Sequence, residues 1–554
     1  MQVIPFSRAA VLFFAGAQVV ACGGCRDGTQ PPQALVASRI EVVPSTLALL
    51  VGTSRALTAT TFDETGRVVS GQAVSFSSSE SAVASVSSSG MVSALAPGSA
   101  VIRATSSGAS GSATVTVLPQ GDSNVAYVVP STTYQTMTGW EGAAQFGELE
   151  CSPIAYPLYR EELVDRLVNE LGVNRVRLQL RSGAENQTDY FAQFLSGQMD
   201  RATWRTHWWD ILNDNGDPMT VNSSGFKFSA LDSKVDHVVQ PLREKLAARG
   251  ERLYVNMTYV DFGASSFEHS QNPQEYGELI LAAFLHLHAK YGWVPDAVEM
   301  ILEPDITQNW RPNTIGAALV AAGDRLKAAG FQPAFIANSA TSMSTALTYF
   351  DQMIVMPRVR EYLTDFSYHR YAGVSDDVLT QIGMRAEQYG VNTGMSEHIG
   401  SGVDDLFADL TIGRNSWWQQ FALAYCGIND GGGIYYRIDQ TNPQSPYIVL
   451  TQRARYLRQY FYYVRLGAVR IGVVGGDPAH DVVAFRNTDG RFVVVAKTDK
   501  AGSVQIGGLP SGTYGINYTT ASAFNASLPD QTISGAQVLT TSIPASGVLT
   551  VFRR

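Results

Sequence analysis

The sequence predicts three folded domains in series: a β-sandwich, a (β/α)8 TIM barrel and a second β-sandwich. Three observations predict this order. Residues 36–119 are rich in Ser, Thr, Val and Ala and contain short alternating runs separated by glycines, which is typical of a small sandwich. Residues 126–467 alternate apolar β-type runs with helical patterns, and residues 468–554 return to β-type runs. Strands that alternate with helices indicate parallel βαβ units, and eight such units form a barrel.

Composition and motifs exclude several classes of protein. The chain has 554 residues, 45% hydrophobic and 16% charged, with a formal net charge of −9. This apolar fraction argues against a disordered chain, and the negative charge provides no basic footprint for nucleic acid. The sequence carries no His-Glu-x-x-His zinc motif, phosphate-binding loop or dinucleotide fingerprint. We therefore expect no metal, no cofactor and no nucleic-acid partner, and we expect a monomer.

The first 21 residues resemble a lipoprotein signal peptide. Arg8 precedes an apolar run, Ala9 to Val20, which is too short to span a bilayer as a helix of the mature protein. The run ends in Val19-Val20-Ala21-Cys22, which resembles a lipobox. The resemblance implies acylation of Cys22, a cell-envelope location and a membrane link through that anchor alone. An ordinary secretory signal is the alternative. Residues 22–35 are interpreted as a tether.

The first sandwich, residues 36–119, has its own sequence pattern. Runs such as Val83-Ala84-Ser85-Val86 alternate apolar and small polar residues, and glycines follow at Gly90 and Gly98. The order of these features, followed by Ile102, resembles a bacterial Ig-like domain of group 2. Such modules are usually spacers or adhesion units, and we favour the spacer interpretation.

The barrel prediction depends on eight β-then-α units. The expected strands are 137–143, 173–180, 253–258, 297–302, 333–338, 365–371, 392–396 and 433–438. Helical patterns between and after them include 156–171, 233–248, 274–291, 314–329, 378–389, 415–426 and 448–466. The clearest insertion is 183–231, whose tryptophans, Trp204, Trp208 and Trp209, fit either a sugar platform or packing equally well.

Two carboxylates lie where a barrel enzyme places its chemistry, at the carboxyl ends of strands. Glu303 follows the fourth expected strand, and Glu397 follows the seventh. Hydrolysis of a glycosidic bond needs one carboxylic acid to protonate the leaving oxygen and a second carboxylate as nucleophile or base. Each Glu alone is as readily explained as a strand-end cap or salt bridge. The pair, on one barrel mouth, indicates glycoside hydrolysis.

These residues resemble a known family. Glu303-Pro304 after strand four and Glu397 after strand seven follow the pattern of clan A glycoside hydrolases. Residues 460–471, from the last helix into the second sandwich, resemble glycoside hydrolase family 30, as does the start at 137–142. The resemblance spans about 126–554. It implies a retaining mechanism, with Glu303 as acid/base and Glu397 as nucleophile, and a carbohydrate substrate.

Other expected site residues follow from strand positions. His369 and Tyr371 share one face of strand six, and the resemblance makes them orienters of the nucleophile; a buried core histidine is the alternative for His369. Arg177 on strand two resembles the clan's positive neighbour of the nucleophile, although an ion pair between barrel and helices is the alternative. Three further residues are expected to line the cleft: Trp140, Asn256 and Tyr259.

One departure from the family bears on function. The clan has Asn before the acid/base Glu, where it binds the sugar 2-hydroxyl, and this chain has Leu302. The sequence therefore supports an exported, lipid-anchored retaining glycosidase as the first interpretation. The second is a non-catalytic surface protein that binds glycan through a degenerate barrel.

Overall fold

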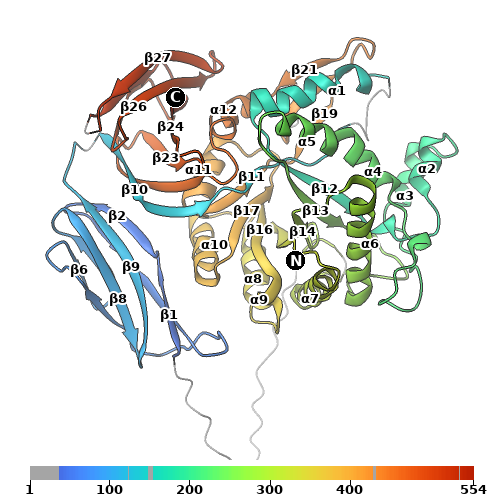
Figure 1. Ribbon diagram of the computed structural model, residues 1–554, viewed down its shortest axis with the longest axis horizontal. Coiled ribbons are helices and arrows are strands. Elements are labelled where there is room, and N and C mark those ends of the chain that lie inside the picture. Colours follow the sequence, from blue (N-terminus) through green and yellow to red (C-terminus); the bar gives the residue numbers. More distant parts are fainter. Residues whose placement is uncertain (1–36, 123, 147–153, 308, 428–431, 536) are drawn as a thin grey trace, which may run out of the picture.

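The computed structural model describes residues 37–554 except 123, 147–153, 308, 428–431 and 536. Residues 1–36, which include the expected signal peptide, the tether and Cys22, lie outside the described residues. The predicted fold class is confirmed: an N-terminal β-sandwich, a barrel of eight parallel strands and a C-terminal β-rich domain follow one another (Figure 1). Among the described residues, no helix combines the length and apolarity needed to cross a membrane.

The N-terminal sandwich has a core of its own, in which Val92, Ile102 and Val115 are fully buried. Its main sheet has the order β2-β9-β8-β5, with β3-β7-β6 and β1-β4 beside it. The domain contacts the remainder of the chain at Thr46, whose hydroxyl donates to the carbonyl of Thr133 at 2.9 Å. Its strands are β1 (Arg39–Val43), β2 (Thr46–Leu50), β3 (Ser54–Ala56), β4 (Thr58–Phe62), β5 (Ser75–Ser78), β6 (Ala84–Val86), β7 (Met91–Ala94), β8 (Gly98–Ser106) and β9 (Ala109–Leu118).

The barrel sheet has the strand order β11-β18-β17-β16-β15-β14-β13-β12. It closes where the Arg177 amide donates to the Gly142 carbonyl at 3.1 Å and the Ala144 amide to the Arg177 carbonyl at 3.0 Å. The strands are almost wholly buried, as both faces of a parallel sheet must be. They are β11 (Gly139–Trp140), β12 (Arg175–Arg181), β13 (Tyr254–Val260), β14 (Ala297–Glu299), β15 (Ala334–Ser342), β16 (Leu363–Ala372), β17 (Asn392–Glu397) and β18 (Asn415–Trp418).

Helices cover the outside of the barrel, and several show the expected end signals. The hydroxyl of Ser375 caps one by accepting from the Val378 amide at 3.2 Å, and Gly390 ends the same helix at φ 65°, a left-handed conformation that favours glycine. The barrel helices are α1 (Tyr156–Asp165, continued to Leu171 as a π-helical segment), α5 (Gln240–Ala247), α6 (Pro273–Tyr291), α7 (Pro312–Ala328), α8 (Met343–Met353), α9 (Val359–Tyr362), α10 (Asp376–Tyr389), α11 (Val403–Thr411) and α12 (Gln452–Phe461).

The last βα unit differs from the prediction. Residues 415–426, expected as a helix, form two strands, β18 and β19 (Ala422–Cys426). The eighth barrel strand is therefore β18, and the expected strand 433–438 instead lies in β20 (Ile434–Asp439), between β19 and β21 (Tyr447–Leu450). The physical reason is burial: Trp417 and Trp418 are both fully buried, and Gly394 on β17 leaves room for Trp417, since a Cβ there would lie 2.1 Å from its ring.

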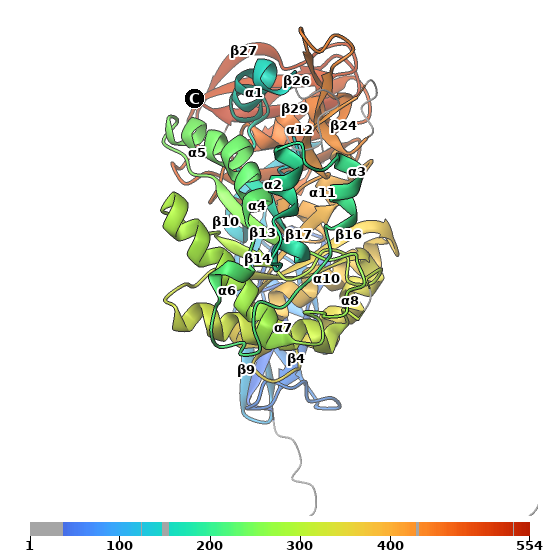
Figure 2. The same cartoon turned by 90° about the vertical axis from the view of Figure 1, so that its right-hand side faces the viewer.

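The insertion after β12 forms α2 (Tyr190–Leu195), α3 (Arg201–Thr206) and α4 (Ser229–Lys234). Figure 1 places α2 and α3 on the opposite side of the barrel from the N-terminal sandwich, and Figure 2 looks onto that side. Trp204 is packed, at 3% exposure, and stacks on Phe194 with ring centroids 4.9 Å apart. Packing is therefore the role that the structure gives to Trp204.

The C-terminal β-rich domain, whose strands form one sheet in the order β27-β26-β29-β24-β23-β22-β10-β25-β28, includes a strand from before the barrel. The sequence division assigned residues 126–136 to the barrel, but residues 125–136 form β10, which pairs antiparallel with β22 and parallel with β25. A core continuous with the barrel includes Phe485 and Val495 of this domain. Its strands are β10 (Val125–Thr136), β22 (Val469–Gly475), β23 (His480–Arg486), β24 (Phe492–Thr498), β25 (Gly502–Gly507), β26 (Gly512–Thr520), β27 (Ala526–Ile533), β28 (Leu539–Ile543) and β29 (Gly547–Arg553).

The described residues also include one disulfide-bonded cysteine. Cys426, the last residue of β19, takes part in a disulfide. The other three cysteines of the chain are Cys22, Cys25 and Cys151, and all three lie outside the described residues.

Asp409 of α11 ties two barrel strands together. Its carboxylate accepts from the Tyr368 hydroxyl at 2.7 Å, from Arg370 at 2.6 Å and from the Trp418 indole at 2.9 Å. The side chain is 0% exposed. Since Tyr368 and Arg370 belong to β16 and Trp418 to β18, this one carboxylate fixes α11 against both strands.

We expect Asp409→Ala to lower the free energy of unfolding by about 3–5 kcal/mol, because it leaves the buried Arg370 short of its main counter-charge. Asp405→Ala is the matched control: Asp405 also pairs with Arg370 but is 30% exposed, so its loss should cost at most about 1 kcal/mol. Urea unfolding followed by circular dichroism measures both. Equal losses in the two variants would contradict the role of Asp409.

Candidate active site

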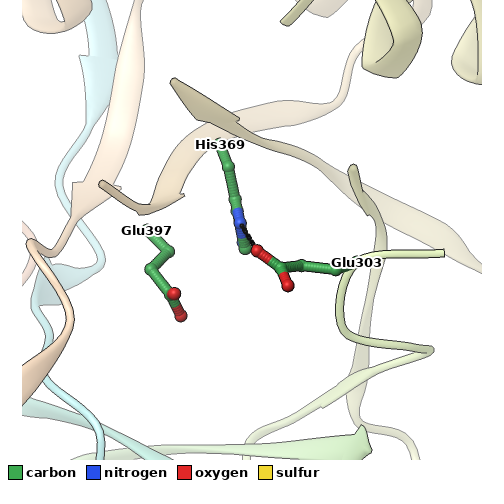
Figure 3. Close-up of side chains that lie close together, drawn as sticks. All are labelled: Glu303, His369 and Glu397. Atoms are coloured by element: carbon green, nitrogen blue, oxygen red, sulfur yellow. Dashed lines mark hydrogen bonds and ion pairs between the residues drawn. The ribbon is translucent and has the colours of Figure 1, made fainter. Parts of the chain in front are cut away.

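Glu303, His369 and Glu397 meet at the carboxyl ends of the barrel strands (Figure 3). One oxygen of each carboxylate and a ring nitrogen of His369 lie within 4.8 Å of one another. Carboxyl groups about 5–5.5 Å apart are typical of retaining glycosidases, whereas inverting enzymes need roughly 6.5–9.5 Å. The spacing of Glu303 and Glu397 therefore belongs to the shorter class.

The backbone at Glu303 is held in an uncommon conformation. Its φ is 52°, a left-handed value that costs a non-glycine residue of order 1–3 kcal/mol. Neighbouring strands hold it there: the Glu303 amide donates to the Ser339 carbonyl at 3.1 Å, and the Leu302 amide donates to the Tyr259 carbonyl at 3.0 Å. Asp305 completes the link by accepting from the Thr341 amide at 2.8 Å. The loop after β14 thus fixes the direction of the Glu303 side chain.

Glu397 lies in a positively charged environment. Arg177, fully buried, forms an ion pair with it, and the same guanidinium donates to the Ser396 carbonyl at 3.2 Å. The Tyr371 hydroxyl donates to its other oxygen at 3.0 Å. Burial alone would raise the pKa of the Glu397 carboxyl, but Arg177, His369 and Tyr371 outweigh burial and lower it below the usual value. Glu397 is therefore a carboxylate at neutral pH.

His369 contacts the other carboxyl group. Its Nδ1 lies 3.0 Å from Oε1 of Glu303, and the side chain is 0% exposed. Its Nε2 is buried and has no hydrogen-bond partner within the described part of the chain. Both residues were expected to orient the nucleophile: Tyr371 contacts Glu397, whereas the hydrogen bond of His369 goes to Glu303 instead.

The three residues expected to line the cleft have fully buried side chains in the barrel interior. Trp140, Asn256 and Tyr259 are each 0% exposed. The Trp140 indole donates to the Val464 carbonyl at 2.7 Å, and the Tyr259 hydroxyl bonds to Nδ1 of His269 at 2.8 Å. Trp140 and Tyr259 thus use their polar atoms inside the barrel, whereas Oδ1 of Asn256 is buried without a partner among the described residues.

Beneath the mouth lies a buried carboxylate that the sequence interpretation missed. Glu299 of β14 accepts from Asn256 at 3.0 Å, and from Thr258 and Ser339, each at 2.5 Å. Ser339 also supplies the carbonyl that holds Glu303. Glu299 precedes Glu303 by only four residues, and its place on an inward-facing strand position is the one sequence signal that indicates it.

Two glutamines near Glu397 were also missed. Gln419 donates to the Ser396 carbonyl, and Gln420 donates to the Ser401 carbonyl. The side-chain oxygen of each is buried without a partner among the described residues. Both directly follow β18, so assigning residues 415–426 to a helix concealed them.

The described residues contain two groups whose side-chain atoms are close enough to ligate one metal ion. One is the Glu303, His369 and Glu397 set, and the other is Glu185, Asp214 and Glu275. In the first group, Arg177 already supplies a positive charge to Glu397. The second group comes from the segments that follow β12 and β13, and the ion pair that the structure gives it is the one between Glu185 and His269.

Comparison with known proteins gives one family match and many similar structures. Residues 36–117 match the model of the bacterial Ig-like domain, group 2. No curated protein matches the sequence. The catalytic domain of the family 30 xylanase C from Talaromyces cellulolyticus is 16% identical, with a TM-score of 0.59, and the alignment covers 78% of this chain and all of that one.

Two further structures have the same architecture. A conserved exported protein from Bacteroides fragilis is 12% identical at a TM-score of 0.57, covering 77% of this chain and 100% of the other. A protein titled an endo-beta1,6-glucanase is 16% identical at a TM-score of 0.54, covering 79% and 94%. The chain thus joins a group 2 bacterial Ig-like domain to the barrel-and-sandwich fold found in glycoside hydrolase family 30.

Proposed function

We propose that this protein is a retaining glycoside hydrolase that cleaves O-glycosidic bonds of a poly- or oligosaccharide. The observation that carries the proposal is the pair of carboxyl groups, Glu303 and Glu397, at the spacing of a double-displacement mechanism. Their different surroundings support two different roles, because Glu397 has an arginine and a phenol and Glu303 has an imidazole. The fold shared with family 30 structures supports the same reaction class.

In the first step, an oxygen of Glu397 attacks the anomeric carbon while the bond from that carbon to the leaving oxygen breaks. Glu303 gives its proton to the leaving oxygen, so the departing sugar leaves as a neutral alcohol. In the second step, Glu303 takes a proton from water, and the water oxygen replaces Glu397 at the anomeric carbon. Two inversions give net retention, and both side chains return to their starting protonation states.

The similar structures also indicate which substrates to test. The similar structures titled as a xylanase and as an endo-beta1,6-glucanase support β-linked polysaccharides as the first substrates to test. The Leu302 side chain is apolar and only 5% exposed. It therefore supplies no hydrogen bond to a sugar hydroxyl. This feature favours the second candidate function, a non-catalytic glycan-binding protein. Turnover by the wild type separates the two.

Replacing Glu397 tests the nucleophile. We expect Glu397→Ala to reduce kcat by at least about 10⁴-fold, since no covalent glycosyl-enzyme can form. Azide should restore turnover and give a glycosyl azide of inverted configuration. NMR of the first sugar released by the wild type should show the retained anomer. The control is Glu244→Gln, an exposed carboxylate on α5, which should keep wild-type turnover.

Replacing Glu303 tests the acid/base, and its expected effect differs from that of replacing Glu397. Glu303→Ala should impair substrates with poor leaving groups most, because these need protonation. Aryl glycosides with acidic leaving groups should still glycosylate the enzyme, and azide should then give the retained product. An inverted sugar from the wild type, or wild-type rates in either variant, would refute the assignment of roles.

The charge environment of Glu397 predicts the pH profile. Since its pKa is lowered, the acid limb of kcat/KM should lie below the usual glutamate value. Arg177→Gln should move this limb upward by about one unit or more, because the attracting charge is gone. Arg437→Gln, which removes an arginine paired with Asp439 on β20, should leave it unmoved. An unchanged limb in Arg177→Gln would show that another group controls ionisation.

The same pKa shift has a consequence for stability. A carboxyl group with a lowered pKa in the folded state contributes stability that is present above its unfolded pKa. That contribution is lost as the pH falls through the folded value. Acid unfolding of Arg177→Gln should therefore begin at a higher pH than that of Arg437→Gln.

We also propose that the protein is exported and held at the cell envelope by a lipid on Cys22, with the Ig-like domain as a spacer. The lipobox-like residues Val19 to Cys22 support the anchor, and the Ig-like domain and the exported structural relative support a location outside the cytoplasm. Cys22→Ala should move the protein from the detergent-extracted membrane fraction to a soluble or unprocessed form, as followed by immunoblot. Unchanged fractionation would exclude the anchor.

A further inference from the structure

Four acidic side chains meet in the interior on the side of the barrel that carries the insertion. Glu185 and Asp214 belong to the inserted segment after β12, whereas Glu275 and Glu278 lie in the first turns of α6. Their exposed fractions are 1%, 7%, 8% and 1%, respectively. Acidic side chains are almost never this buried unless they are paired with a positive charge or coordinate a metal.

Three of these carboxylates converge on one point. Oxygens of Glu185, Asp214 and Glu275 all lie within 4.8 Å of one another. Calcium binds oxygens at about 2.3–2.6 Å, so two ligands on one ion are at most about 5 Å apart. The Asp214 amide fixes the arrangement by donating to Glu185 Oε1 at 3.0 Å, and the Asn213 side-chain amide donates to Glu275 Oε1 at 3.3 Å.

The cluster also presents oxygens that nothing in the described chain satisfies. Both carboxylate oxygens of Glu278 are buried and accept from no amide, hydroxyl or cationic group there, and their contact is the carboxyl group of Glu275. Oδ1 of Asp214, Oε2 of Glu275 and Oδ1 of Asn213 are likewise buried and accept from no such group. Five such acceptors in one place are unusual, because buried polar atoms in native structures nearly always have partners. A bound cation would satisfy them together.

The nearby positive side chains do not fill this role. His269 bonds through Nε2 to Glu185 at 2.6 Å, on the oxygen that the Asp214 amide does not use. Arg325 attracts Glu278 electrostatically, but its guanidinium donates to the Pro218 carbonyl at 2.6 Å. Glu278 and Glu275 also hydrogen-bond to each other, so this pair shares a proton while no cation is bound.

We infer that Glu185, Asp214 and Glu275 bind a calcium ion, with Glu278 and the Asn213 carbonyl oxygen beside them to complete its surroundings. All of these ligands are hard carboxylate or amide oxygens, with no sulfur or nitrogen donor among the five side chains, which is the donor set that calcium takes. Residues from the loop after β12 and from α6 after β13 hold the ion, so it cross-links two segments that rise from neighbouring barrel strands.

This cross-link lies next to the site. Glu185 hydrogen-bonds to Nε2 of His269, and Nδ1 of His269 lies 2.8 Å from the Tyr259 hydroxyl. The Tyr259 carbonyl holds the amide of Leu302, the residue before Glu303. The ion would therefore fix the inserted segment to the same strand end that supports Glu303. Its binding does not depend on the proposed hydrolase activity, and it is measured without a substrate.

The test uses the full chain, stripped with EDTA and titrated with calcium chloride by isothermal calorimetry. We expect one ion per chain, and a melting temperature that rises by about 3–5 °C at a hundredfold excess of calcium over Kd. Magnesium chloride should have a much smaller effect, since magnesium is smaller and keeps its own waters. A magnesium response equal to that of calcium would contradict the choice of ion.

Near-isosteric variants then locate the site. Glu278→Gln and Asp214→Asn should each weaken calcium binding by at least tenfold. In EDTA, Glu278→Gln should melt at or above the wild-type temperature, because a buried carboxyl group beside Glu275 and Asp214 is replaced by a neutral amide. Glu244→Gln, on the exposed face of α5, should bind calcium as the wild type does. No heat and no shift in melting temperature for the wild type, or wild-type Kd in both cluster variants, would overturn the inference.

Discussion

The site depends on one buried ion pair, between Arg177 and Glu397. Arg177 is fully buried on β12, and in the closed barrel β11 and β18 separate that strand from β17, where Glu397 lies. The pair therefore spans the interior rather than joining neighbours in the sheet. Each partner makes the burial of the other tolerable, since an unpaired charge at this depth is strongly unfavourable. The Tyr371 hydroxyl and the Ser396 carbonyl complete the arrangement around this pair.

The two carboxylates could be identified from the sequence because the topology of a parallel barrel places the carboxyl ends of its strands at one face. Glu303 and Glu397 each follow an apolar run, and the carboxyl ends of all eight strands meet at one mouth. The same logic predicted the positions of His369 and Tyr371, since alternate residues on a strand share a face. The structure brings all four together.

The sequence interpretation failed where local pattern and tertiary burial differ. Residues 415–426 have apolar side chains at spacings that fit a helix, yet the pocket beside Gly394 makes Trp417 a strand residue. Trp140 follows a first-strand pattern, but its indole turns toward Val464 and stacks on Phe461 at 4.6 Å. Short apolar runs of this kind do not distinguish strand from helix, and only the packed neighbours decide.

The acidic cluster could not be predicted from the sequence for a different reason. Glu275 and Glu278 lie near the start of a helix, where acidic residues are ordinary because they complement the helix dipole. Glu185 and Asp214 are far from them in sequence, and no periodicity connects the two pairs. Convergence of such residues is a property of the folded insertion, so it is visible only once the insertion has been placed against α6.

The shared strand β10 has a consequence for how the protein is made. It lies between β22 and β25, although the barrel separates it from both in sequence. At synthesis rates of about 5–20 residues per second, roughly 20–70 seconds pass between the appearance of β10 and that of β22. During that interval β10 has no partner strand, and its buried side chains, such as Val128 and Val129, are exposed. An unpaired apolar strand is a template for aggregation, so a chaperone that shields this segment would raise the yield of folded protein.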